Sequence, residues 1–325
     1  MRNSNFELLR IFAMMLIILH HNMLYFGDLR YPNMEQYIIG TDVYVDSMLN
    51  SIGIIGVNLF VLISGWFGIK SVKRSLLRLF VTFLWCAVFV TSMLSFSTFY
   101  YFDFRHWWFI ENFIVLILLS PIIEKSLENV SFKTHTFWII CLTVANVLFG
   151  WLWGLVNTNG YNYINFIYLY YMGRWARELM SRPVFIKVSF VRGLALLLFM
   201  LSIFISVLIY AKYVQFTEIT SIKWWSYNSP AVLLSSFCVF ILFSTINLKY
   251  NKYINFIATG TLAAYIIHTK DFFYQTVMYR IGDIFSNYSY LGVLFFVIAI
   301  LLGLYTVSAP IEFIISKLRK RFTSQ

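Results

Sequence analysis

The sequence predicts an all-α membrane protein, a polytopic bundle of about ten transmembrane helices with both termini in the cytoplasm. Of its 325 residues, 60% are hydrophobic and only 12% are charged, whereas soluble domains carry about one quarter charged residues. The mean hydropathy is +0.74. Apolar runs of about 18 to 25 residues, the length that lets a helix cross a bilayer, recur along the whole chain. A soluble core could not bury this much apolar surface, so lipid must be the main solvent.

Ten apolar runs are candidates for membrane spans, at 6–26, 48–69, 77–98, 107–123, 135–155, 161–179, 188–210, 229–247, 253–275 and 289–314. The connections are short, apart from a polar segment between Gly27 and about Asn50. No small-residue cleavage site follows the first run, so we expect it to be a retained membrane helix rather than a signal peptide. Since no linker, repeat or soluble region is visible, residues 1–325 are expected to form a single domain.

The cations predict the orientation of the bundle. Eighteen of the 25 lysines and arginines fall in connections on one side, six fall on the other, and Arg10 lies within the first run. Positive residues favour cytoplasmic loops, so both termini are predicted to be cytoplasmic. The net charge of +11 is therefore a topology signal, aided by contact with anionic membrane lipids, and it requires no nucleic-acid partner.

Cysteines and aromatic residues exclude some classes of site. Cys86, Cys141 and Cys238 each fall inside an apolar run without CxxC spacing, so we expect buried thiols and neither a disulfide framework nor a zinc or other metal site. Aromatic residues make up 20% of the chain and cluster near the ends of spans. They fit interfacial belts, although a sugar-stacking surface uses the same residue types.

The first run, "ELLRIFAMMLIILHH" (7–21), carries ionisable residues at both ends. A helix turns about 100° per residue, so a step of eleven returns to within about 20° of the same face, about 16 Å further along. Arg10 and His21 therefore share a stripe, whereas His20 points about 80° away. Glu7 precedes Arg10 by three residues and can pair with it. Taken singly, Arg10 could snorkel to the inner leaflet and His21 could be an interfacial histidine.

Several motifs occur in a characteristic order. Ten residues separate Arg10 from His21, and an acidic residue followed by two leucines comes directly before Arg10. They are followed by "GVNLFVLISGWFGIK" (56–70), "RHWWFIENFIVLILLSPII" (105–123), "IYLYYMGRWAR" (167–177) and "GTLAAYIIHTKDFF" (260–273). Together these segments resemble acyltransferase family 3, the integral membrane O-acyltransferases that act on cell-envelope polysaccharides. Ser64 and Gly65 in the second motif are more typical of close helix packing than of catalysis.

The resemblance implies transfer of an acyl group, usually acetyl from acetyl-CoA, to a sugar hydroxyl of a surface polysaccharide or its lipid-linked precursor. The protein would then lie in a bacterial cytoplasmic membrane. Transfer from a thioester to an alcohol needs a base that is largely neutral near pH 7, which suits imidazole. By resemblance, His21 would deprotonate the acceptor, or would itself carry the acyl group. Arg10 would contact the coenzyme or hold the helix through Glu7.

The donor and acceptor would use opposite sides of the membrane. Donor phosphates need a cationic inner surface, for which Arg74, Arg78 and Arg174 are the candidates, although positive-inside loops carry such residues anyway. His268 is expected at a depth similar to His21, where it could bind or orient the acceptor or make a structural hydrogen bond. The further substrate-binding candidates, at the outer side, are His106, which could instead be an interfacial anchor, Trp108 and Glu111. As an intramembrane carboxylate, Glu111 should have a partner.

Two alternative functions remain open from the sequence. A polysaccharide exporter without acyl chemistry would also be a bundle with ionisable residues, although no inverted repeat with paired broken helices is visible. An acyltransferase with a small or cytoplasmic acceptor is the other alternative. The expected position of the histidines towards the outer side argues against it.

Overall fold

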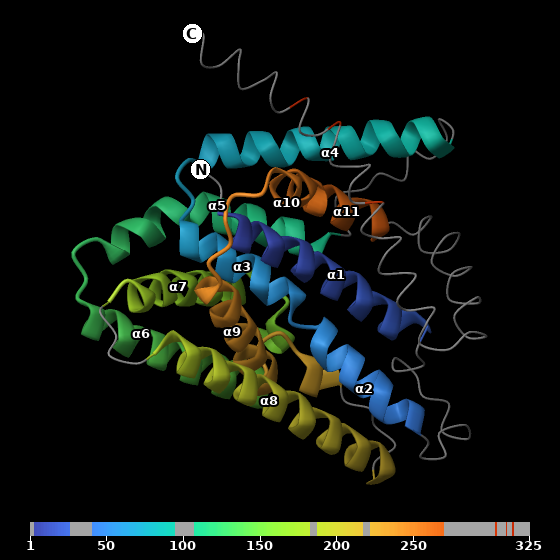
Figure 1. Ribbon diagram of the computed structural model, residues 1–325, viewed down its shortest axis with the longest axis vertical. Coiled ribbons are helices and arrows are strands. Elements are labelled where there is room, and N and C mark those ends of the chain that lie inside the picture. The colour runs from blue at the N-terminus through green and yellow to red at the C-terminus, as the bar shows by residue number, and fades with distance from the viewer. Residues whose placement is uncertain are drawn as a thin grey trace.

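The computed structural model describes residues 3–26, 41–94, 107–182, 187–216 and 222–269, with single positions 303, 310 and 314. Within this part of the chain all regular structure is helical (Figure 1). The α-helices of the described part are α1 (Ser4–Phe26), α2 (Thr41–Gly53), α3 (Gly56–Phe67), α4 (Val72–Leu94), α5 (Trp108–Leu127), α6 (Phe132–Ala145), α7 (Tyr163–Met180), α8 (Val188–Phe216), α9 (Pro230–Thr245), α10 (Lys252–Ile257) and α11 (Thr261–His268). The predicted all-α class is confirmed, and helices occupy each of the first nine expected runs. The tenth run, 289–314, lies outside the described residues except for the three single positions.

Apolar helices of membrane-spanning length are present. Three described stretches are long and apolar enough to cross a bilayer alone: Ser47–Phe67, Phe132–Leu152 and Val188–Ile209. Pro230–Thr245 is a shorter apolar helix. These stretches fit a membrane protein, while the count of ten spans and the side of the termini stay predictions.

Polar residues that precede apolar runs start several of these helices. The side chain of Ser131 accepts a hydrogen bond from the backbone N–H of Thr134, and Asn162 caps α7 in the same way. Ser229 caps α9, where Pro230 occupies the first turn and has no N–H to satisfy. Each cap satisfies a backbone donor that would otherwise be unpaired at the helix start.

Two expected single spans are broken helices. A turn at Ile54 and Ile55 separates α2 from α3, and α2 begins at Thr41 rather than at residue 48. A 3₁₀ turn, Ala258–Gly260, separates α10 from α11. Hydropathy alone cannot locate such breaks, because the residues on both sides are apolar. Irregular backbone at membrane depth is tolerated where protein buries it or a cavity borders it, and Ala258 lies on such a cavity.

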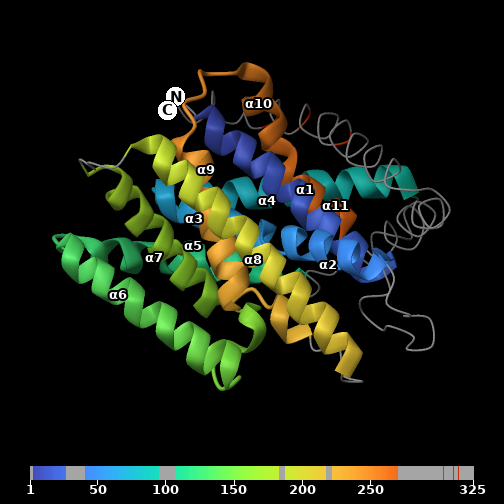
Figure 2. The same ribbon diagram turned by 60° about the horizontal axis from the view of Figure 1, so that its bottom comes forward.

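The centre of the bundle is α3, which packs against α7, α1 and α9. In Figure 1, α4 and α8 lie on opposite edges with α1 and α3 between them, and the turned view in Figure 2 brings α8 to the front of the bundle. A Cβ on Gly65 would lie 2.2 Å from the carbonyl oxygen of Tyr170, and one on Gly173 would lie 2.3 Å from that of Leu62. The helices therefore meet backbone to backbone, and the predicted packing role of Gly65 is confirmed.

The two ends of the bundle differ in character. We call the end that carries Lys70, Arg74 and Arg78 the basic end. At this end, two hydrogen bonds connect segments that are far apart in the sequence. Asn5 donates to the carbonyl of Phe243 (2.9 Å), and Arg177 donates to the carbonyl of Trp66 (3.3 Å). We call the opposite end the far end.

The far end has contacts of its own. There Trp225 donates to Ser51 (3.0 Å), and Asn58 donates to the carbonyl of Tyr227 (2.9 Å). Connections that the charge count assigns to one side thus share one end of the bundle.

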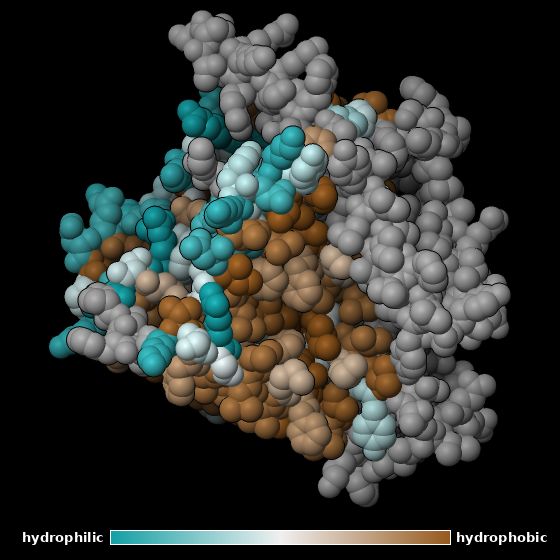
Figure 3. Space-filling view, in the orientation of Figure 1, coloured by the Kyte–Doolittle hydropathy of each residue, from teal (hydrophilic) through white to brown (hydrophobic). Residues whose placement is uncertain are grey.

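Apolar side chains cover the outside of the described bundle. The outward face of α8 exposes large hydrophobic residues, among them Phe190, Leu197, Met200 and Phe204. Figure 3 shows a broad brown face bordered by teal side chains on its left and upper sides. Such a surface suits lipid rather than water. It also explains one wrong prediction: Cys86 and Cys238 are buried, but Cys141 is exposed on α6 because that part of the helix faces outward.

Candidate active site

A cavity of about 660 Å³ lies between α1, α3, α4, α5 and the broken α10–α11 segment. On α1, Arg10, Met14 and Ile17 line it. These residues are spaced by four and three positions, so they form one stripe of the helix. The predicted stripe through Arg10 therefore faces an internal space, and the next residue on that stripe is His21.

The cavity is cationic at its mouth and apolar along its walls. Its exposed lining residues at the basic end are Lys70, Arg74 and Arg78, with Ser71 and Ser75 beside them. Of the described residues that line it, Arg10 is the fourth cation and none is acidic. Deeper walls are formed by the aromatic side chains Phe60, Phe109 and Phe113. The cavity can thus accept an elongated ligand that is anionic at one end and less polar at the other.

Glu7 and Arg10 form the predicted ion pair across one turn of α1. Glu7 is buried, whereas the Arg10 side chain is 28% exposed and lies 5.8 Å from the ring centroid of Phe67. The carboxylate therefore holds the guanidinium of Arg10, which lines the cavity and has further N–H groups that can donate to a ligand.

His21 and His268 meet about one helical turn beyond the cavity, and neither is among its lining residues. Nδ1 of His21 lies 2.9 Å from Nε2 of His268, and the ring centroids are 5.1 Å apart. On α11, Thr261, Leu262 and Tyr265 line the cavity, and His268 follows Tyr265 by three residues. His21 follows Ile17 by four residues, about 6 Å along α1. Two lining stripes thus lead to one histidine pair, and the prediction that His268 shares the depth of His21 is confirmed.

His20 is held apart from this pair. It is buried, and its Nδ1 lies 2.6 Å from Oδ1 of Asn50 on α2. Neither His20 nor His21 is among the lining residues of the cavity. The lining residues Arg10, Met14 and Ile17 continue by helical spacing to His21 and not to His20, as the angular count predicts.

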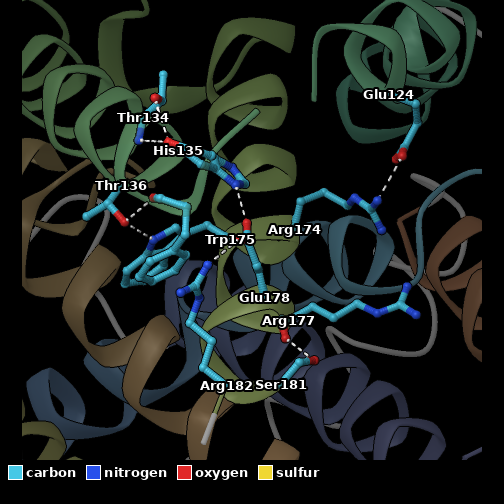
Figure 4. A network of polar contacts seen from close by, with 12 residues as sticks. Glu124, Thr134, His135, Thr136, Arg174, Trp175, Arg177, Glu178, Ser181 and Arg182 are labelled. Atoms are coloured by element: carbon cyan, nitrogen blue, oxygen red, sulfur yellow. Dashed lines mark hydrogen bonds and ion pairs between the residues drawn. The ribbon is translucent and has the colours of Figure 1, made fainter. Parts of the chain in front are cut away.

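Arg174 does not join Arg74 and Arg78 at the cavity. Its guanidinium pairs with Glu124 at 3.1 Å, as Figure 4 shows. Glu124 also accepts a hydrogen bond from the hydroxyl of Tyr170 (2.6 Å), which in turn accepts one from the backbone N–H of Ile69 (2.8 Å). Arg174 thus belongs to a network that fixes the chain just before the cationic mouth.

The same close-up shows a second network behind α7. His135 lies 3.2 Å from Glu178, and Trp175 donates to Thr136 (2.9 Å) (Figure 4). These contacts hold α6 against α7. Neither helix carries a residue of the cavity lining, so we assign the network to the scaffold.

The other acceptor-side candidates are less closely connected to the cavity. Trp108 packs at the far end against Tyr161 and Tyr227, with ring centroids 4.7 and 5.2 Å apart. Glu111 is exposed on α5, and the expected partner for its side chain is not found among the described residues. His106 lies outside the described residues.

Some lining residues were not selected from the sequence as site residues. Lys70 precedes the selected arginines, and Tyr265 lies one turn before His268. Applying the stripe count of α1 to the segment that ends at His268 points to Tyr265, because residues three apart share a helix face. Within the described residues, no three His, Cys, Asp or Glu side chains are grouped as metal ligands.

Comparison with known protein families identifies a family that matches most of the chain. The family described as "Acyltransferase domain", acyltransferase family 3, matches residues 3–311. Searches of curated proteins and of solved structures gave no match. The match covers nearly the whole chain, so it includes both cavity-lining stripes and the histidine pair.

Proposed function

The chain belongs to acyltransferase family 3, and from that premise we propose that it is a membrane O-acetyltransferase. It would transfer acetyl from acetyl-CoA to a sugar hydroxyl of a surface polysaccharide or of its lipid-linked precursor. The observation that carries the proposal is a cavity lined by exposed cations and by two helix stripes that, continued by one turn, lead to His21 and His268.

The cavity supports binding of the donor from the basic end. Arg74, Arg78, Lys70 and Arg10 offer charge-assisted hydrogen bonds to the phosphates of coenzyme A. The less polar pantetheine arm would lie along Met14, and the thioester would approach His21. Arg10 and His21 are eleven residues apart, about 16 Å along the helix, so the donor would reach the histidine only in an extended conformation.

The proposed reaction needs one base and one acid, and His21 would serve as both. Its imidazole accepts the proton of the acceptor hydroxyl while the oxygen attacks the thioester carbonyl carbon. The tetrahedral intermediate collapses with cleavage of the carbon–sulfur bond. The thiolate takes the proton back from His21, so the products are an O-acetyl ester and the free thiol of coenzyme A.

The acceptor would enter from the far end, where His21 is partly exposed. Trp108 and its aromatic neighbours lie at the same end and offer faces for stacking on a sugar. In this arrangement the acetyl group passes between two half-sites that meet at His21, and the protein would lie in the bacterial cytoplasmic membrane with both termini inside.

Labelled acetyl-CoA tests the proposal directly. In membranes that contain the protein, we expect label to enter envelope glycan, and His21→Ala should reduce the rate by about 10²- to 10⁴-fold, the usual contribution of a general base. His20→Ala is the matched control, because His20 bonds Asn50 and does not contact His268. The loss of activity in this variant should be smaller.

Two results would contradict this assignment. Undiminished acetylation in His21→Ala would remove that histidine from the mechanism. Normal acetyl content with less glycan at the surface after loss of the gene would favour the exporter. Size-exclusion profiles of the variants distinguish lost chemistry from lost folding.

A further inference from the structure

Two consecutive hydrogen bonds determine which nitrogens of the two histidines carry hydrogen. Nδ1 of His268 lies 2.8 Å from the carbonyl oxygen of Ala264. A carbonyl oxygen only accepts, so His268 must carry its hydrogen on Nδ1. Nε2 of a neutral His268 is then an acceptor. Since it faces Nδ1 of His21 at 2.9 Å, the hydrogen between the rings belongs to His21, and Nε2 of His21 carries a lone pair that can accept a proton.

We propose that His268 is a positioning residue that holds His21 in its Nδ1–H tautomer, so that Nε2 of His21 is the atom that accepts the substrate proton. This assignment rests on the proposed function only for its catalytic consequence. The tautomer itself follows from the two hydrogen bonds and can be tested without any substrate.

The arrangement parallels the way a buried carboxylate orients the histidine of serine proteases, where an orienting group that imposes the wrong tautomer lowers kcat about 10⁴-fold. Here the orienting acceptor is an imidazole that is 4% exposed. A carboxylate at this position would bring a full negative charge into a poorly solvated part of the bundle. A neutral imidazole offers the same acceptor without net charge, and it is anchored in turn by the Ala264 carbonyl.

The proton positions during the reaction follow from this chain of bonds. When Nε2 of His21 takes the acceptor proton, His21 becomes an imidazolium that still donates its Nδ1–H to His268. His268 neither gains nor loses a proton, because its Nδ1–H stays on the Ala264 carbonyl. The proton leaves Nε2 of His21 for the departing thiolate, which restores the starting tautomer.

Two substitutions separate positioning from packing. His268→Gln keeps a side-chain oxygen that can accept from His21, whereas His268→Leu fills similar space and accepts nothing. We expect His268→Leu to lower kcat by about 10²- to 10⁴-fold, with the KM for acetyl-CoA changed less than about threefold because the phosphate contacts are distant. His268→Gln should restore kcat to within about tenfold of the unsubstituted protein.

Nitrogen-15 NMR of histidine-labelled protein reports the tautomer of His21 directly. If His268 had only a packing role, its substitution would leave this tautomer unchanged. The signals of His21 are identified by their loss in His21→Gln. We expect them to report Nδ1–H in the unsubstituted protein and in His268→Gln, and a redistribution of tautomers in His268→Leu. His20→Gln should leave the tautomer of His21 unchanged.

The outcomes distinguish this inference from the proposed function. An Nε2–H tautomer of His21 in the unsubstituted protein would overturn the inference, as would equal losses of kcat in the Gln and Leu variants with the tautomer unchanged. If the protein transfers no acetyl group but His21 shows the expected tautomer and its dependence on His268, the proposed function fails while the hydrogen-bond assignment stands.

Discussion

Replacing Gly65 by alanine perturbs the closest helix contact near the candidate site. The new methyl group would lie 2.2 Å from the carbonyl oxygen of Tyr170 and 2.9 Å from two other backbone atoms of that residue. Ordinary contact begins at about 3.4 Å. Because backbone atoms cannot rotate away as a side chain can, α3 and α7 must separate by more than about 1 Å.

Two opposing effects determine the expected change in the free energy of unfolding. Overpacking costs about 1–3 kcal/mol, and the upper value applies because both obstructing surfaces are rigid backbone. Alanine also recovers about 1 kcal/mol relative to glycine in a helix. The net expectation is a loss of about 2 kcal/mol in the free energy of unfolding.

Gly193→Ala is the matched control, because Gly193 lies within α8 and a Cβ there meets nothing within 4 Å. The same methyl group should stabilise the protein by about 1 kcal/mol at this site. Thermal unfolding of the purified protein in detergent should therefore shift down for Gly65→Ala and slightly up for Gly193→Ala. Equal midpoints for the two variants would refute the backbone-to-backbone contact.

This perturbation also has a functional component. The end of α3 leads through Gly68 and Ile69 to Lys70 at the cavity mouth. A shift of α3 moves these residues relative to the arginines on α4. Gly65→Ala is thus expected to raise the KM for acetyl-CoA more than it lowers kcat, measured by transfer of labelled acetyl at several donor concentrations.

Three further predictions concern the mouth and the scaffold. Arg74→Gln removes a cavity cation and should raise the KM for acetyl-CoA about tenfold or more, which corresponds to the loss of one hydrogen bond to a charged group. Lys73 is the neighbouring cation outside the cavity lining, so Lys73→Gln should change this KM little. Equal effects of the two substitutions would refute the phosphate site. Tyr170→Phe removes the hydroxyl between Ile69 and Glu124 and should cost about 1–3 kcal/mol in thermal unfolding, whereas an unchanged midpoint would contradict that network. Asn165→Ala removes a buried amide that bonds a second asparagine and a backbone carbonyl, and urea or thermal unfolding should show a similar loss.

The sequence predicts the first helix well because helical geometry alone relates its residues. A stripe at 100° per residue selects Arg10 and His21, and the ion pair with Glu7 needs only one turn of helix. The contact with His268 is different. The two histidines are 247 positions apart, and similar depth does not specify how each helix is rotated about its axis.

The cationic candidates show the same limit. Arg74, Arg78 and Arg174 all occur in positively charged connections, so their composition does not distinguish them. The structure places the first two on the cavity and pairs the third with Glu124. The difference arises from a carboxylate on another helix, which no local pattern around Arg174 reveals.

Breaks in the helices were also beyond the reach of hydropathy. Gly53 and Gly56 flank the break between α2 and α3, whereas Gly65 and Gly173 lie inside intact helices. All four approach another backbone closely: a Cβ on Gly56, for example, would lie 2.5 Å from the carbonyl oxygen of Ala13. A glycine in an apolar run therefore indicates close packing but does not show whether the helix breaks beside it. Hydropathy contains no information about the neighbour across such a contact.

The pairing of Glu7 with Arg10 has a consequence for how the protein is made. Both residues belong to α1, so the arginine enters the bilayer already neutralised by its own helix, and its insertion does not wait for a later segment to supply a counter-charge. The bond between His21 and His268 can form only after α11 has been synthesised and packed. In the nascent chain, Arg10 would thus be paired with a counter-charge as soon as the first span has formed. The histidine pair would form only when most of the bundle has assembled.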